Sequence, residues 1–164
     1  MEPSTTIGPL INHAAIEKID RQVQDAVSQG ANLHSGGRRL TEDGLDNGCF
    51  YAPTLLSGVT SEMLIYREET FGPVAAVIPF DEEDDVIAMA NDTDYGLAAY
   101  VYTQNLSRAL RTFEDLNFGI IGINDINPTS AAAPFGGMKE SGLGREGARE
   151  GLDESLETKL GGLS

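Results

Sequence analysis

Three glycines near the carboxyl end of the chain have the spacing of a dinucleotide-binding loop. Gly142, Gly144 and Gly147 give the pattern G-x-G-x-x-G within SGLGREG, residues 141–147. Such a loop holds a pyrophosphate when a buried strand precedes it, a helix follows it, and an acidic residue lies about twenty positions further on. Here the preceding segment AAAPFGGMKE contains Pro134 and two glycines, which disfavour a central strand. The dinucleotide loop is therefore a minor alternative, and the role of these glycines has to follow from the rest of the chain.

The other residues with reactive side chains are a single cysteine, two histidines and an acidic run. Cys49 lies in NGCFYAPT with no histidine nearby in the sequence, so a structural thiol is favoured over a nucleophile. A lone cysteine forms no internal disulfide, which is typical of a reducing compartment. His13 and His34 have no companions at metal-ligand spacing, and the run DEEDD at 81–85 suits the first turn of a helix. We therefore predict no metal site.

A more unusual segment is YREETFGPV, residues 66–74. Glu68, Glu69 and Phe71 precede a Gly-Pro pair that leads into an apolar strand. Acidic and aromatic side chains would then lie at the end of a strand, where α/β sheets commonly bind their ligands. A plain turn before the strand explains the same residues equally well, so the pattern alone leaves both interpretations open.

The hydrophobic pattern predicts an α/β framework for these residues. A helix is expected over 12–29, capped by Asn12 and ended by Gly30, and is followed by strands at 31–34 and 51–56. Strands are then expected at 74–80, 97–103 and 120–124. Helices are expected between them at 82–91, where Asp81 would be the cap, and at 106–117. Near-continuous apolar strands joined by helices predict a parallel-rich sheet covered on both faces, a three-layer α/β/α arrangement.

The end of the chain has a different character. A short helix is expected near 145–151, followed by an extended stretch at 155–160 in which Leu156, Thr158 and Leu160 alternate. A lone strand buries little by itself, and an exposed strand edge is usually paired. We therefore expect this stretch to pair with another subunit in a homo-oligomer.

Composition and charge limit the classes of partner. The chain has 164 residues, 40% of them hydrophobic, and a formal net charge of −15. Strong negative charge repels nucleic-acid phosphates and anionic membrane surfaces, so we predict no nucleic acid and no membrane as partner. The N-terminus MEPSTTIGPL has no signal-peptide pattern, and a cytoplasmic location is expected. A well-solvated acidic surface is favoured over adaptation to high salt.

Four segments together resemble a known family. They are EETFGPV at 68–74, NDTDYGLAAYVYT at 91–103, GIIGIN at 119–124 and APFGGMKESGLGREG at 133–147. In this order and spacing they resemble the C-terminal part of the NAD(P)-dependent aldehyde dehydrogenase superfamily, in particular its succinate-semialdehyde dehydrogenase branch. The resemblance covers nearly the whole chain and implies a fragment of an aldehyde-dehydrogenase-like catalytic domain.

The resemblance also implies roles for individual residues. Glu69 would accept hydrogen bonds from the ribose beside the nicotinamide, and Phe71 would pack near the nicotinamide. Phe135 would line the aldehyde pocket, and Thr129 and Ser130 would lie in the substrate loop that precedes it. The SGLGREG segment would be a tight loop near the substrate entrance, so its three glycines would serve turns with positive φ and close packing. The final strand would join the oligomerisation sheet of a partner subunit.

The residues that perform the family's chemistry precede the matched region. That chemistry uses a cysteine thioester, hydride transfer to NAD or NADP, and a glutamate base. Cys49 lies downstream of the nucleophile's place in the pattern, so no catalytic residue is assigned here. We expect a parent enzyme that oxidises a semialdehyde to a carboxylic acid, and a chain that is inactive alone and binds no cofactor tightly.

Two alternatives to a piece of an enzyme stay open. One is a non-catalytic truncated paralogue that acts as an oligomerisation module, and the other is a small enzyme that uses Cys49. The expected domain division is a partial aldehyde dehydrogenase catalytic domain at 1–150 and a C-terminal oligomerisation strand and tail at 151–164.

Overall fold

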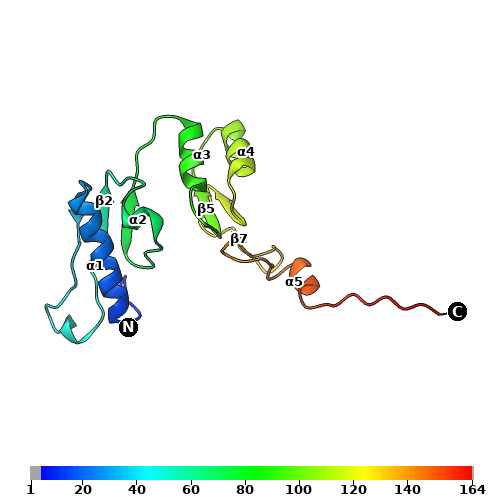
Figure 1. The fold of residues 1–164 in the computed structure, drawn as a ribbon, viewed down its shortest axis with the longest axis horizontal. Coiled ribbons are helices and arrows are strands. Elements are labelled where there is room, and N and C mark those ends of the chain that lie inside the picture. Colours follow the sequence, from blue (N-terminus) through cyan, green and yellow to red (C-terminus); the bar gives the residue numbers. More distant parts are fainter. Residues whose placement is uncertain (1–4, 164) are drawn as a thin grey trace. The chain divides into compact units, whose positions relative to one another are not determined.

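The computed structural model describes residues 5–163 of the chain. The chain divides into two compact units, Met1–Pro79 and Phe80–Ser164 (Figure 1). The division expected at residue 150 stays a prediction. Among residues 5–163, no helix is long and apolar enough to cross a membrane.

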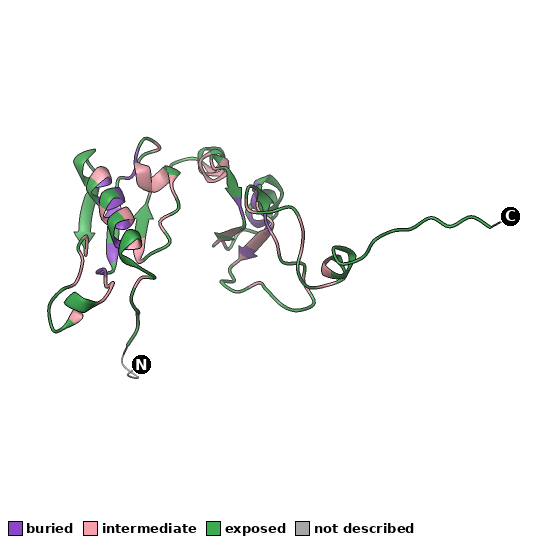
Figure 2. Ribbon diagram, turned by 60° about the horizontal axis from the view of Figure 1, so that its bottom comes forward, coloured by how far each residue is buried: buried purple, intermediate pink, exposed green. Residues whose placement is uncertain are grey.

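The first unit is built on the long helix α1 (His13–Ser28). Asn12 caps it as the sequence predicts, because its Oδ1 accepts a hydrogen bond of 2.9 Å from the amide of Ala15. One face of α1 is buried, through Ile16, Ile19, Gln22, Val23 and Ala26. Figure 2 shows this buried stripe along the helix. The stripe packs against Leu56 and Met63, both almost fully buried, to form the core of the unit.

A three-stranded sheet completes the first unit. Its strands are β1 (Asn32–Ser35), β2 (Thr54–Ser57) and β3 (Val74–Val77), in the order β1-β2-β3. β1 pairs with β2 antiparallel, with an irregular register between Leu33 and Ser35, and β2 pairs with β3 parallel. The 3-10 helix η1 (Leu45–Asn47) lies between β1 and β2, and the short helix α2 (Leu64–Arg67) lies between β2 and β3.

The second unit contains two helices, two strand pairs and a last short helix. Its elements are α3 (Glu83–Asn91), β4 (Tyr95–Gly96), β5 (Ala98–Val101), α4 (Leu106–Asp115), β6 (Ile120–Ile123), β7 (Met138–Lys139) and α5 (Glu150–Asp153). β5 and β6 pair in parallel, with α4 as their crossover, and β4 pairs with β7 antiparallel. The predicted alternation of strands and helices is therefore present.

The parallel strands are paired within each unit. Among the described residues, the parallel partner of β3 is β2 and that of β5 is β6, and no single sheet joins all of them. A parallel sheet needs cover on both faces, yet Val77 and Tyr100 are about half exposed. The mixed α/β content is confirmed, and the continuous three-layer sheet stays a prediction.

Two local predictions differ from the structure. Asp81 does not cap α3, because Glu82 is the N-cap and makes no side-chain capping hydrogen bond. Residues 155–160 form no strand, and Leu156 and Leu160 are 70% and 98% exposed (Figure 1). A single extended segment has no ladder partner, so its pairing with another subunit stays a prediction.

Helix α4 leaves an apolar stripe uncovered. Leu106, Leu110 and Phe113 are 74%, 55% and 53% exposed. Their spacing of four and three residues places them on one face of the helix. The neighbouring face carries the buried residues Ala109 and Thr112. The helix is therefore covered on one side only within this unit.

Candidate functional site

The two glutamates of the EETFGPV segment have different surroundings. Glu68 ends α2, and its carboxylate accepts a hydrogen bond of 2.7 Å from the guanidinium of Arg21 on α1. The side chain of Glu69 is exposed, and its carboxylate has no hydrogen-bond partner within residues 5–163. The first glutamate is thus occupied by contacts within the unit, and the second is available to donors from outside it.

Phe71 has an unusual backbone conformation. Its φ is 46°, in the left-handed region that bulky residues rarely adopt, and its side chain is 78% exposed. Backbone strain of this kind costs about 1–3 kcal/mol and is concentrated at ligand-binding sites. An exposed carboxylate and an exposed aromatic ring therefore lie two residues apart, directly before β3. A carboxylate can accept hydrogen bonds from a diol, and a flat ring can pack against a planar heterocycle.

Phe135 lies in the second unit, on the loop between β6 and the glycine motif. Its amide donates to the carbonyl of Glu146 (2.8 Å), and the amide of Glu146 donates back (2.7 Å). Phe135 is 40% exposed and borders a cavity of about 370 Å³. The cavity is also lined by Leu97, Gly136, Gly137, Ser141, Gly142, Gly144, Arg145, Glu146 and Glu154. The loop thus presents an aromatic side chain beside a small cavity.

Thr129 and Ser130 lie on the same loop but do not line that cavity. Both are exposed. The hydroxyl of Thr129 donates to Asn127 Oδ1 (2.8 Å), and the carbonyl of Ser130 accepts from the amide of Ala133 (3.0 Å). Of the five site residues taken from the resemblance, Glu69 and Phe71 therefore lie on the first unit. The other three share a loop of the second.

The glycine motif forms turns rather than a strand-to-helix connection. Gly142 and Gly147 have φ of 137° and 69°, which glycine adopts without strain. Between them, Arg145 Nη1 donates to the carbonyls of Gly137 and Gly144, each at 2.8 Å. The prediction of backbone-conformation glycines is confirmed at these two positions. The strand before the motif is the exposed two-residue β7, which is antiparallel, and not the buried parallel strand that a dinucleotide loop needs.

Lys139 links the same loop to the end of α3 by hydrogen bonds. Its ammonium donates to the carbonyls of Asn91 (3.0 Å) and Thr93 (2.9 Å). The neighbouring amide of Glu140 donates to the carbonyl of Asp94 (3.0 Å), next to the β4–β7 pair. The NDTDYG and GGMKESG segments, far apart in the sequence, are therefore hydrogen-bonded neighbours.

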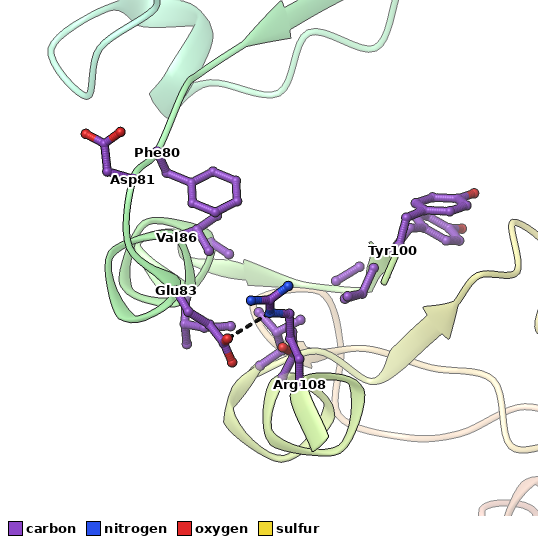
Figure 3. Close-up of a pocket in the computed structure, with 13 residues that line it drawn as sticks. Phe80, Asp81, Glu83, Val86, Tyr100 and Arg108 are labelled. Carbon is purple, nitrogen blue, oxygen red and sulfur yellow. Dashed lines mark hydrogen bonds and ion pairs between the residues drawn. The ribbon is translucent and has the colours of Figure 1, made fainter. Parts of the chain in front are cut away.

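A second cavity of the second unit was not predicted from the sequence. It has a volume of about 420 Å³ and lies between α3, β5 and α4 (Figure 3). At its rim, Glu83 accepts hydrogen bonds from Arg108 (2.8 Å) and Arg111 (2.9 Å). These bonds hold the pKa of Glu83 below its ordinary value, and the bond from Arg108 has the largest effect. The only sign of this arrangement in the sequence is the spacing of Arg108 and Arg111, which lie about one helical turn apart.

The alternative reactive groups find little support. Cys49 is half-buried and packs against the core of the first unit. Across the part of the chain that the structure describes, no group of three or more Cys, His, Asp or Glu residues is arranged to hold a metal ion.

Comparisons with known proteins agree with the sequence motifs. A family model described as "Aldehyde dehydrogenase family" matches residues 1–160. The mitochondrial succinate-semialdehyde dehydrogenase of Rattus norvegicus is 50% identical over 99% of this chain and 31% of its own length. A probable succinate-semialdehyde dehydrogenase [NADP(+)] of Sinorhizobium fredii is 48% identical over 99% of this chain and 33% of its own.

Solved structures give the same result. An aldehyde dehydrogenase from Brucella melitensis biovar abortus is 52% identical with a TM-score of 0.90, covering 97% of this chain and 32% of that one. A succinate-semialdehyde dehydrogenase from Burkholderia pseudomallei is 44% identical with a TM-score of 0.88, covering 93% and 31%. The chain thus spans about a third of the length of the proteins it matches.

Proposed function

Because this chain belongs to the aldehyde dehydrogenase family, we propose that it forms the C-terminal third of an enzyme that oxidises an aldehyde to a carboxylic acid. The placement at the C-terminal end rests on the order of the EETFGPV, NDTDYG and PFGG motifs. The substrate is a semialdehyde such as succinic semialdehyde, since the rat, Sinorhizobium and Burkholderia proteins carry that activity in their names. In this proposal the chain contributes to binding, and the nucleophile and the cofactor domain lie outside it.

The observation that carries the proposal is that Glu69 and Phe71, two positions apart, both have exposed side chains. Their side chains fit the part of NAD or NADP assigned to them, because an exposed carboxylate with no hydrogen-bond partner among residues 5–163 can accept hydrogen bonds from both hydroxyls of a ribose. The exposed ring of Phe71 offers a flat apolar surface beside it. The bound cofactor would supply hydride acceptance, while these two residues orient it.

The residues of the second unit form the substrate side of the proposal. Phe135 lines the aldehyde pocket, and Thr129 and Ser130 present exposed hydroxyls on the preceding loop. Hydroxyls can donate to the carboxylate at the far end of a semialdehyde, which makes this loop the part of the chain that selects the substrate. Arg145 and Lys139 hold the loop in place through backbone carbonyls.

The test is a chimeric enzyme. This chain replaces the matching segment of the rat succinate-semialdehyde dehydrogenase, and reduction of NAD+ and NADP+ is followed with succinic semialdehyde. We expect turnover from the chimera and none from the isolated chain. In the chimera, Glu69→Gln should raise KM for the cofactor about tenfold or more, as expected for a lost hydrogen bond to a charged group. Glu17→Gln, at an exposed glutamate on α1, is the matched control.

Several outcomes contradict the proposal. An inactive chimera that folds refutes the functional assignment, and an active chimera indifferent to Glu69→Gln refutes the cofactor role. Turnover by the isolated chain supports the alternative enzyme, which Cys49→Ser then tests.

A second candidate function is a non-catalytic oligomerisation module. It is favoured by the exposed leucines of the tail, Leu156, Leu160 and Leu163. In both proposals the segment 155–160 pairs with another subunit, and the division into 1–150 and 151–164 follows from that pairing. Sedimentation of the chain with and without residues 155–164 decides whether the tail assembles it.

The cytoplasmic location belongs to the proposal as well. The rat relative is named as a mitochondrial protein, so the location is decided by fractionation of the source cells.

A further inference from the structure

The core of the first unit contains a fully buried glutamine. Gln22 lies on α1 between the core residues Ile19 and Val23 and has no exposed surface. Burying an amide is unfavourable unless both of its polar atoms are hydrogen-bonded. Gln22 Oε1 has no partner among the described residues. Thr54, the other buried polar residue of this unit, is by contrast fully bonded, to Ala52 and Gly37.

The other amide atom of Gln22 reaches the EETFGPV segment. Nε2 donates to Glu68 Oε2 (3.4 Å) and to the backbone carbonyl of Glu69 (3.5 Å). Arg21, the preceding residue of α1, donates to the same oxygen of Glu68 (2.7 Å). Both bonds of Gln22 are long, and they start from a side chain that the core encloses fully. The bond to the carbonyl of Glu69 links the core to the peptide between Glu69 and Thr70, one residue before Phe71.

We propose that Gln22 is a positioning residue for Glu69 and Phe71. The amide of Gln22 holds the carbonyl of Glu69 against the core, so the carboxylate of Glu69 faces outward and the chain enters the left-handed turn at Phe71. An apolar side chain of the same size would remove the unpaired Oε1 and pack equally well. Gln22 therefore orients the segment that carries Glu69 and Phe71, and it adds nothing to the free energy of unfolding compared with an apolar side chain of its size. This inference rests on the proposed function for the identity of the ligand, but the geometry is independent of it.

The experiment compares two matched substitutions on α1 in the full chain. Gln22→Met keeps the volume and removes both donors, whereas Gln24→Met changes an exposed glutamine that bonds only Asp20 on its own helix. The readouts are the thermal midpoint and the rate of chymotryptic cleavage after Phe71, with cleavage after the exposed Tyr102 as an internal reference. Cleavage requires a segment that can open, so its rate follows the population of the loosened loop.

We expect Gln22→Met to leave the midpoint unchanged or higher and to raise cleavage after Phe71 about threefold or more. Cleavage after Tyr102 should stay constant, and Gln24→Met should alter neither quantity. Unchanged cleavage after Phe71 in a folded variant refutes the proposal. A lower midpoint with faster cleavage at both sites also refutes it, because Gln22 would then be only a structural residue.

The same substitution separates this inference from the proposed function. In the active chimera, Gln22→Met should raise KM for the cofactor about threefold or more with little change in kcat, and an unchanged KM would overturn the inference. If the unsubstituted chimera has no activity, the proposed function fails, while the proteolysis of the chain still decides the role of Gln22.

Discussion

A methyl group at Gly119 should displace the loop that carries Phe135. Gly119 precedes β6, and its amide donates to the carbonyl of Gly96 (2.9 Å). A Cβ at this position would overlap the carbonyl oxygen of Gly136 and lie 3.0 Å from the Cα of Gly137. These atoms belong to the backbone, so no side-chain rotation relieves the overlap. Gly119→Ala therefore requires the loop or the strand to move.

The magnitude follows from two opposing effects. Inserting a methyl group into a packed site costs about 1–3 kcal/mol. Gly119 does not have a left-handed backbone, so alanine is compatible with its conformation and gains roughly 0.4–1 kcal/mol from the unfolded state. The expected net loss in the free energy of unfolding is about 1.3 kcal/mol from the middle of the two ranges, with extremes of about 0 and 2.6 kcal/mol. At about 2–4 °C per kcal/mol, the thermal midpoint should fall by several degrees.

The assay is urea and thermal unfolding followed by circular dichroism, with Gly8→Ala as the matched control. No atom lies within 4 Å of a Cβ built at Gly8, so the control should be as stable as the wild type or slightly more so. Amide exchange of Phe135 and Glu146, which bond each other, reports where the strain is relieved. If Gly119→Ala matches the control in stability, the close approach of the two segments is not a constraint and the reasoning is wrong.

Three further predictions concern other contacts. The pKa of Glu83 is held below its ordinary value, mainly by Arg108, so its contribution to stability is complete above the ordinary pKa of a glutamate and is lost as the pH falls through the lowered pKa. The difference in thermal midpoint between Glu83→Gln and wild type should therefore be present at neutral pH and vanish in acid. Lys139→Met removes two hydrogen bonds to carbonyls at the end of α3, and amide exchange of Glu140 should quicken about fivefold, whereas unaltered exchange would contradict the role of the ammonium. Leu56→Ala at a fully buried position should cost about 2–5 kcal/mol in urea unfolding, and a loss below about 1 kcal/mol would mean that the core is not continuous there.

Local chemistry explains which elements were predicted correctly. The start of α1 follows from a cap and a 3.6-residue apolar period, both of which are local in the sequence, and Asn12 makes the expected bond. The parallel pair β5–β6 follows from two apolar strands joined by a helix. The prediction that Asp81 caps α3 was wrong, because several neighbouring acidic residues can each occupy the N-cap position and Glu82 does so. The continuous sheet that joins these strands stays a prediction, because strand order depends on contacts that no local pattern contains.

The candidate site was only partly visible in the sequence. The resemblance singled out Glu69 and Phe71, but two adjacent glutamates are indistinguishable until Arg21 is seen to bind only the first. The backbone strain at Phe71 has no sequence signal, because glycine or asparagine would be expected there. Gln22 lies 46 positions from Glu68, and its place in an apolar stripe gives no hint of that contact.

The uncovered stripe of α4 has a consequence for the life of the chain during synthesis. Leu106, Leu110 and Phe113 form the kind of exposed apolar surface that chaperones bind and that promotes aggregation while a protein is incomplete. A newly made chain therefore presents on this helix a surface that chaperones can bind for as long as nothing covers it. Any change that exposes more of this stripe should lower the soluble yield of the chain.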